Sequence, residues 1–420
     1  SDGEYLLRIT DHLGKGSPKH VYRIETEAFA PEVLATIPQF RNRDTQTRQM
    51  LPIARGNQVA TALNISRKSF TGDIQFLAKN LPAGVTMEAP TVNTSFTSSP
   101  ILLRAAPDAP LANSLVDLRL KYENPEKKQL VEGNFVQNVA LVYGPPNNRT
   151  YYDTKVDRLA VAVVAPLPFK VKLHQPVCPI VKSGSLNLKV EIIRDANFTK
   201  AVTVRILTRP PGIGAKSSLT IATGKSVGYY PLTASGGAAV GVWKIGVQAE
   251  TSAPGGGIWR SASDFIDLKI EEPYLSMKLN LTAVQRGQEG EMLCDLSVKR
   301  PFAGKATAEL KGLPPFSATT KVEFDSNASQ ISFPIQTEDK SRAGLTKNLF
   351  CYVKIPYSGE LISHSVGQGG QIRLDNPPPK PKAPAKTKPK AVAKAPTKPA
   401  KKKPLSRLEQ LRLAAQGGAN

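Results

Sequence analysis

Apolar and polar residues alternate with a period of two in many short stretches of this 420-residue chain. In the stretches LNLKVEII (186–193) and VTVRIL (202–207), every second side chain is apolar. Half-buried antiparallel strands have this pattern because successive side chains leave opposite faces of the pleated backbone. No stretch before residue 405 shows the 3.6-residue apolar period of an amphipathic helix. The sequence therefore predicts an all-β fold.

The same turn signals recur three times along the chain. A polar turn that contains glycine is followed 26 or 27 residues later by a turn centred on proline. Repeats of about 100 residues with about seven short strands are typical of immunoglobulin-like β-sandwiches. We interpret the proline turn as a structural corner, where proline presets φ, rather than as a ligand site. The glycine and proline pairs are Gly56 and Pro82, Gly184 and Pro210, and Gly287 and Pro314.

These signals divide the chain into six predicted segments. The first 30 residues contain two predicted strands, EYLLRIT and HVYRIET, and two strands alone cannot bury a core. The first sandwich is the longest, because YGPPNNRTYY adds a hairpin. The segments are 1–30 for the two strands; 33–165, 166–272 and 273–374 for three immunoglobulin-like sandwiches; 375–404 for a disordered cationic linker; and 405–416 for a short amphipathic helix.

Half of the excess positive charge lies in the last tenth of the chain. The formal net charge is +22, and residues 377–420 contain ten Lys, two Arg and one Glu, or +11. This tail has almost no apolar bulk, so it cannot offset the entropy of folding. Its charge is expected to attract an anionic polysaccharide or cell envelope. The tail lysines are Lys380, Lys382, Lys386, Lys388, Lys390, Lys394, Lys398, Lys401, Lys402 and Lys403.

No catalytic or metal-binding motif is found in the sequence. A G-x-S-x-G nucleophile motif and an H-E-x-x-H metal motif are both absent. The sequence therefore predicts a protein that is not an enzyme and that uses no metal or cofactor. The four histidines are scattered, and we interpret them as solvated or structural side chains; they are His12, His20, His174 and His364.

Two of the three cysteines are predicted to face each other. Alternation puts Cys294 and Cys351 on the inner faces of the expected second and sixth strands of the third sandwich. Immunoglobulin sandwiches can join those strands by a disulfide, and an oxidising compartment permits the bond. Two buried, reduced cysteines that act as small apolar side chains are the alternative.

The two tryptophans have different predicted environments. Trp243 alternates with Ile245 and Val247, which predicts a core position. Trp259 follows the loop sequence PGGGI, where an exposed indole could stack on a sugar ring. Partial packing at the end of a hairpin is the alternative for Trp259.

The stretch DGEYLLRITDHLGKGSPKHVYRIE resembles the final strands of bacterial pre-peptidase C-terminal (PPC) domains, which are small secreted β-sandwiches. The stretch from PFKVKLHQPVCPIV to ILTRPPGIGAKSS is similar to tandem immunoglobulin-like repeats behind PPC domains in large secreted planctomycete-type proteins. The resemblance implies export, a non-catalytic β architecture and a PPC domain of which the first half is missing.

We therefore expect a non-enzymatic, exported protein that acts as a spacer, adhesion or surface-associated module outside the cell, on its surface or in the periplasm. Its expected partners are an anionic polysaccharide or envelope surface and an upstream peptidase or other domain. A carbohydrate-binding accessory region of a larger secreted hydrolase or peptidase is one alternative. A non-specific nucleic-acid binder is another; sequence-specific recognition is not expected, because the tail has no aromatic side chain for base stacking. No apolar stretch is long enough to span a membrane.

Overall fold

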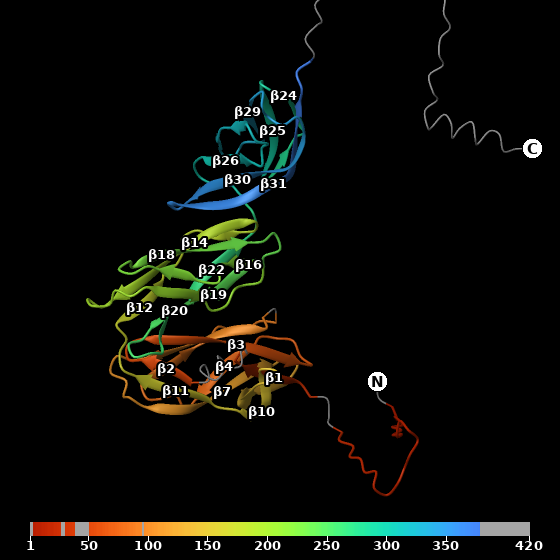
Figure 1. Cartoon of the computed structure of the whole chain (residues 1–420), viewed down its shortest axis with the longest axis vertical. Helices are drawn as coiled ribbons and strands as arrows, with labels where there is room; N and C mark the ends of the chain where they lie inside the picture. Colours follow the sequence, from red (N-terminus) through yellow and green to blue (C-terminus); the bar gives the residue numbers. More distant parts are fainter. Residues whose placement is uncertain (1–2, 27–29, 38–49, 95, 379–420) are drawn as a thin grey trace, which may run out of the picture. The chain divides into compact units, whose positions relative to one another are not determined.

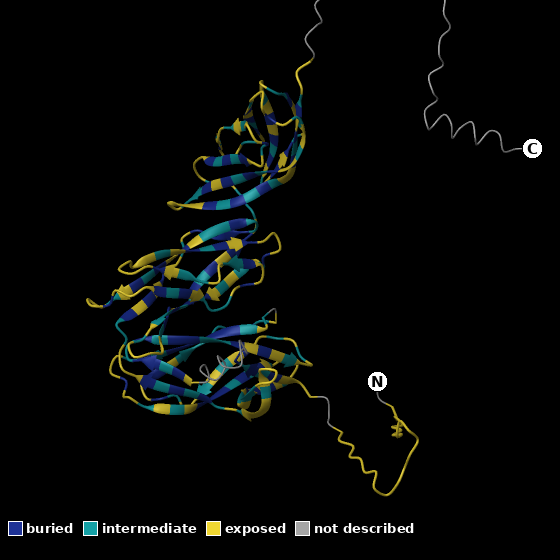
Figure 2. Ribbon diagram, in the orientation of Figure 1, coloured by how far each residue is buried: buried dark blue, intermediate teal, exposed yellow. Residues whose placement is uncertain are grey.

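The structure, a computed structural model, describes residues 3–26, 30–37, 50–94 and 96–378. These residues form 31 strands and no helix. Figure 2 shows buried and exposed residues alternating along the strands, as the sequence pattern requires. The predicted all-β fold with tandem immunoglobulin-like sandwiches is confirmed. The linker beyond residue 378 and the predicted helix lie outside the described residues.

The two strands predicted near the N-terminus are not formed. Residues 3–26 contain turns but no strand, and all of their side chains are exposed. Two strands bury too little surface to be stable alone, and no sheet of the described chain pairs with them. The strand prediction was therefore wrong for this segment, and its assignment to a PPC-like domain stays a prediction.

The first sandwich has two facing sheets with the immunoglobulin strand arrangement (Figure 1). One sheet has the order β1-β3-β6-β5, the other β4-β7-β11-β2, and β8 pairs with both β7 and β1. The hairpin expected from YGPPNNRTYY is present as β9 and β10, which pair only with each other. The strands are β1 (Glu32–Thr36), β2 (Met50–Ala54), β3 (Gln58–Lys68), β4 (Gln75–Lys79), β5 (Val85–Glu88), β6 (Ser98–Ala105), β7 (Asn113–Asn124), β8 (Gln129–Phe135), β9 (Gln137–Gly144), β10 (Arg149–Val156) and β11 (Leu159–Val164).

The second sandwich repeats this arrangement. Strands β12, β14, β18 and β16 form one sheet, β17-β15-β20-β21 form the facing sheet, and β13 pairs in parallel with β22. The strands are β12 (Phe169–Leu173), β13 (Ile180–Val181), β14 (Gly184–Arg194), β15 (Val202–Ile206), β16 (Ile213–Ala215), β17 (Leu219–Ile221), β18 (Val227–Ala234), β19 (Gly241–Ile245), β20 (Val247–Ser252), β21 (Ile258–Ala262) and β22 (Ile266–Glu271).

In the third sandwich, the sheet β23-β25-β29-β27 faces the sheet β28-β26-β30-β31. Strand β24 pairs in parallel with β31. Its sheet continues into the second sandwich, because Gly184 and Ser185 of β14 pair with His364 and Ser363 of β31. The strands are β23 (Leu275–Leu279), β24 (Thr282–Gln285), β25 (Glu289–Val298), β26 (Ala306–Lys311), β27 (Ser317–Thr319), β28 (Val322–Phe324), β29 (Gln330–Thr337), β30 (Gly344–Tyr357) and β31 (Glu360–Asp375).

The three proline corners have the same geometry. In each, the amide three residues after the proline donates to the proline carbonyl, at 3.0, 3.1 and 3.2 Å in chain order. The third residue of each turn has a positive φ, as a type II turn requires. Glycine provides this conformation in the first two turns, at Gly84 (φ 76°) and Gly212 (φ 79°). In the third turn the position is Phe316 (φ 61°), whose side chain is 55% exposed.

We predict that Phe316→Gly stabilises the third sandwich by about 1 kcal/mol. A residue with a Cβ loses about 1–2 kcal/mol in this conformation, and the greater freedom of glycine in the unfolded chain offsets part of the gain. Phe316→Ala is the matched control, since it removes the ring but keeps the Cβ. Thermal unfolding by calorimetry should show a higher midpoint for Phe316→Gly than for Phe316→Ala. Equal midpoints would show that the backbone conformation is not the cause.

Candidate functional site

A buried amide joins the first and second sandwiches. The Asn57 side chain is 6% exposed. Its Nδ2 donates to the main-chain oxygen of Phe169 at 2.9 Å, and its Oδ1 accepts from Ser261 Oγ at 2.7 Å and from the Gln58 amide at 2.8 Å. A buried amide left without partners would cost free energy, so these bonds favour this one pairing of the two surfaces.

Charged and apolar contacts surround that amide. The Arg104 guanidinium of the first sandwich contacts Asp264 of the second at 2.8 Å and Glu88 of its own sandwich at 2.6 Å. A small apolar cluster lies at the same junction and excludes water from it. Its members are Ala60 and Leu102 from the first sandwich and Ala262 from the second, with Leu207 and Phe265 of the second packed against them.

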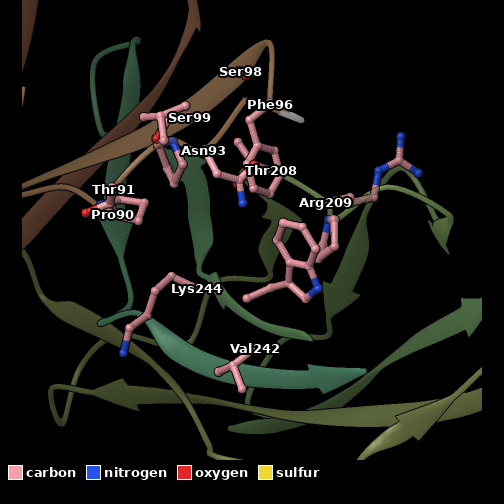
Figure 3. A pocket seen from close by; sticks show the side chains of 14 residues that line it. Pro90, Thr91, Asn93, Phe96, Ser98, Ser99, Thr208, Arg209, Val242 and Lys244 are labelled. Atoms are coloured by element: carbon pink, nitrogen blue, oxygen red, sulfur yellow. The ribbon is translucent and has the colours of Figure 1, made fainter. Parts of the chain in front are cut away.

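A cleft of about 230 Å³ lies between the first two sandwiches (Figure 3). One wall comes from residues 90–93, 96 and 98–100, and the other from 208–210 and 242–244. Among the described residues, the lining combines two aromatic rings, several hydroxyl groups and two basic side chains, and none of them is acidic. The residues are Pro90, Thr91, Val92, Asn93, Phe96, Ser98, Ser99, Pro100, Thr208, Arg209, Pro210, Val242, Trp243 and Lys244.

The two aromatic rings of the cleft pack edge to face. The ring centroids of Phe96 and Trp243 are 4.6 Å apart, and the planes cross at 84°. Trp243 Nε1 donates to the main-chain oxygen of Ala239 at 3.0 Å, which fixes the indole. A core position was predicted for Trp243; its ring instead contacts the edge of the core and remains half-buried, whereas Ile245 on the same face is buried.

A single arginine holds the wall that carries Phe96. The Arg67 guanidinium donates to the main-chain oxygens of Phe96 at 2.6 Å and of Val92 and Asn93, both at 2.9 Å. Burial lowers the pKa of Arg67. The main chains of Val92 and Ile74 also exchange hydrogen bonds of 2.9 and 3.0 Å. The aromatic pair therefore rests on a loop whose backbone is fixed at several points.

Several polar groups of the cleft have no partner within the described part of the chain. The hydroxyl groups of Thr91, Ser98 and Thr208 form no hydrogen bond there, and Arg209 is exposed and forms no ion pair. Lys244 differs, because it pairs with Asp267 at 2.8 Å. Figure 3 shows Arg209 and Lys244 on opposite sides of the cleft.

Trp259, the predicted sugar-stacking residue, lies at the start of β21. Its indole is half-buried, contacts the core of the second sandwich, and lies 6.4 Å from the ring of Phe198 between centroids. Trp259 does not line the cleft that contains Trp243. Its role as a glycan platform stays a prediction.

The structure places Cys294 on β25 and Cys351 on β30, in facing sheets of the third sandwich. Both side chains are fully buried in one core, and the two thiols are free. Interaction with Cys294 and burial raise the pKa of Cys351, whereas the neighbouring Cys351 lowers the pKa of Cys294. Whether the two sulfurs become bonded stays a prediction.

The histidines have different environments. His20 accepts or donates a hydrogen bond with Ser17 at 2.8 Å, His174 contacts Glu191 at 2.7 Å, and His12 is exposed. His364 on β31 is fully buried, and neither ring nitrogen has a hydrogen-bond partner among the described residues. Burial lowers the pKa of His364 to about 4. The four histidines were interpreted as solvated or structural side chains. That interpretation did not predict a buried imidazole without hydrogen-bond partners at His364.

The remaining predicted site lies outside the described residues, because all ten tail lysines follow residue 378. Among the residues that are described, no group of three or more His, Cys, Asp or Glu side chains could hold a metal ion. No described helix is long and apolar enough to cross a membrane.

No family model and no curated protein matches this sequence. Three solved structures illustrate what the fold is similar to. The FdeC adhesin of Escherichia coli is 11% identical with a TM-score of 0.18, and the match covers 84% of this chain and 100% of that one. The fibronectin(III)-like modules of Clostridium thermocellum CbhA are 9% identical (TM-score 0.19; 49% and 94% covered), and the D0–D1 domain of intimin is 12% identical (TM-score 0.17; 49% and 97% covered). TM-scores this low carry no functional argument, so the immunoglobulin-like assignment rests on the strand order described above.

Proposed function

We propose that this chain is a non-enzymatic module of an exported surface or adhesion protein. The sandwiches would act as a spacer, and the lysine-rich tail would attract an anionic polymer of the envelope or matrix. The observation that carries the proposal is the way in which successive sandwiches are joined. The Asn57 bonds connect the first two, and the pairing of β14 with β31 connects the second and third. Such contacts resist separation of neighbouring sandwiches, which suits a spacer.

The tail provides the proposed attachment. Residues 377–420 carry half of the net charge of +22, and their ten lysines are interspersed with proline and alanine. Such a segment attracts polyanions without selecting a sequence or a shape. Its binding should weaken steeply with salt, because each neutralised anionic group releases a counterion.

Co-sedimentation with isolated envelope polysaccharide and, separately, with DNA tests this proposal. We would compare the full chain with a full-length variant in which the ten tail lysines are replaced by Gln. The matched control replaces the same lysines by Arg and so keeps the charge. We expect the parent and the Arg variant to bind polysaccharide at low salt and to be released at high salt, whereas the Gln variant should lose most of this binding.

Two results would contradict the proposal in different ways. Binding of the Gln variant to polysaccharide at high salt would place the attachment in the sandwiches instead of the tail. Binding to DNA with no binding to polysaccharide would favour the nucleic-acid alternative.

A second candidate function is carbohydrate binding by the folded part of the chain. The cleft between the first two sandwiches favours it, because aromatic rings and unpaired hydroxyl groups line the same small cavity. In that case the chain would act as the binding region of a larger secreted protein.

A further inference from the structure

We propose that the cleft between the first two sandwiches binds one acidic sugar unit, a hexuronate, of a longer polysaccharide. The proposal deepens the proposed function, since it rests on an anionic surface polymer as the partner. It adds a second contact that is independent of the tail. Arg209, Phe96 and Trp243 would be the binding residues.

The size and lining of the cleft favour a single sugar ring. A volume of about 230 Å³ lies below the roughly 300–1,000 Å³ that is common for sites of drug-sized ligands. Because Trp243 Nε1 is already bonded to Ala239, the indole can offer only its ring surface. The face of a sugar ring carries C–H groups that pack on such surfaces, and its hydroxyl groups need polar partners at the rim. Thr91, Ser98 and Thr208 can supply them.

The charges of the cleft favour an acid. The described residues of the lining include Arg209 and Lys244 but no Asp or Glu. The Lys244 ammonium is engaged by Asp267, so Arg209 is the basic group that is free to pair with a ligand. A planar guanidinium binds a carboxylate through two parallel hydrogen bonds, and the C6 carboxylate of a hexuronate offers this geometry beside the stacked ring.

The position of Arg209 is fixed by the fold. Arg209 immediately precedes Pro210, whose carbonyl accepts from the Ile213 amide at 3.1 Å in the repeated corner. On the opposite wall, Arg67 holds the backbone around Phe96. The corner of the second sandwich thus has a structural role and also presents the proposed carboxylate ligand.

Calorimetric titration with trigalacturonic acid, and with neutral galactotriose as the comparison, tests the proposal. The full chain with its tail lysines replaced by Gln serves as the parent, so that the tail does not contribute. Arg209→Gln should weaken binding of the acid about tenfold and leave binding of the neutral sugar unchanged. Lys347→Gln is the matched control, because Lys347 is an exposed lysine of the third sandwich, and it should bind like the parent.

Trp243→Ala should weaken both sugars, and its thermal midpoint would show whether the second sandwich remains folded. If Trp243→Ala unfolds, Arg209→Gln still decides the question, since Arg209 is exposed and outside the core. The proposal is overturned if Arg209→Gln binds the acid as tightly as Lys347→Gln, or if the parent binds the neutral and acidic sugars equally. An Arg209→Gln chain with its native tail should then be tested by co-sedimentation with polysaccharide. If it still sediments in a salt-sensitive way, the proposed function of the tail stands and only the proposal for the cleft is refuted.

Discussion

Acidification from pH 7 to pH 4 is expected to reduce the free energy of unfolding by about 3 kcal/mol through His364 alone. This imidazole is fully buried, and neither nitrogen has a hydrogen-bond partner among the described residues. Burial lowers its pKa from 6.5 to about 4 in the folded protein. The unfolded chain therefore binds a proton at higher pH than the folded chain does.

The sign and the pH range follow from these two pKa values. Well above pH 6.5 the imidazole is neutral in both states and has no effect on the pH dependence of stability. As the pH falls from 6.5 towards 4, only the unfolded state gains the proton, so stability falls by about 2 kcal/mol at pH 5 and about 3 kcal/mol at pH 4. The pKa values of the paired carboxylates Glu250 and Glu271 are lowered from 4.5 in the folded protein, so their stabilising effect begins to be lost only as the pH falls to about 4.5 and contributes little at pH 5.

Denaturant unfolding at pH 7.5 and pH 5 measures this effect. His364→Leu fills the same apolar site without a titrating group, so the stability loss assigned to His364 should disappear in that variant. His12→Gln, at an exposed position, should keep it. If His364→Leu loses as much stability at pH 5 as the parent, the buried imidazole is not the cause.

The alternation of residues predicted much of this fold, because it records which side of a strand faces a core. It placed Cys294 and Cys351 inward, and both are buried. The same alternation in ISHSV puts His364 on the face of Ile362 and Val366. The sequence pattern alone does not reveal that the imidazole lacks partners, since that depends on β14, almost 180 residues earlier.

The cleft was not predictable, because its walls come from residues more than 100 positions apart. Trp243 alternates with core residues, and only the neighbouring sandwich brings Phe96 against it. Arg209 belongs to a turn that was interpreted as purely structural. At the N-terminus, alternation predicted strands that did not form, because a strand also needs a partner strand.

The sequence carries a signal for the conformation of Phe316. Aligning the three corners puts Phe316 where Gly84 and Gly212 stand, and those glycines adopt a positive φ. The three glycine turns are less alike in conformation than the three proline corners. In the second repeat the positive φ belongs to Ser183 rather than to Gly184, because Gly184 already begins β14 and a Cβ there would meet the Ser363 carbonyl at 2.7 Å.

The second large effect concerns the free energy of unfolding of the third sandwich in oxidising buffer. We predict that Cys294 and Cys351 form a disulfide when the protein refolds with oxidised glutathione, and that the bond stabilises the third sandwich by about 4 kcal/mol. The two cysteines are 57 positions apart in the sequence. Closing a loop of that length lowers the entropy of the unfolded chain by an amount that corresponds to about 4 kcal/mol. Both side chains are buried in one core, on strands of facing sheets, which places them to react with each other as the sandwich forms.

In the exchange, one cysteine thiolate, for example that of Cys294, would attack oxidised glutathione and release one reduced glutathione. Cys351 would lose its proton, displace the second glutathione and close the bond, so that two protein thiols and one glutathione disulfide become one protein disulfide and two glutathione thiols. Because both sulfurs are fully buried, the reaction should occur during folding rather than in the folded protein.

Alkylation and thermal unfolding after refolding test the prediction. The oxidised protein should weigh 2 Da less than the reduced protein. On unfolding it should expose one alkylatable thiol, that of Cys178. Reduction should return its thermal midpoint to the lower value of the reduced protein. The Cys294→Ala, Cys351→Ala double variant is the control, and oxidation should leave its midpoint unchanged. Three alkylatable thiols after oxidative refolding would show that the pair stays reduced and fills the core as two small apolar side chains.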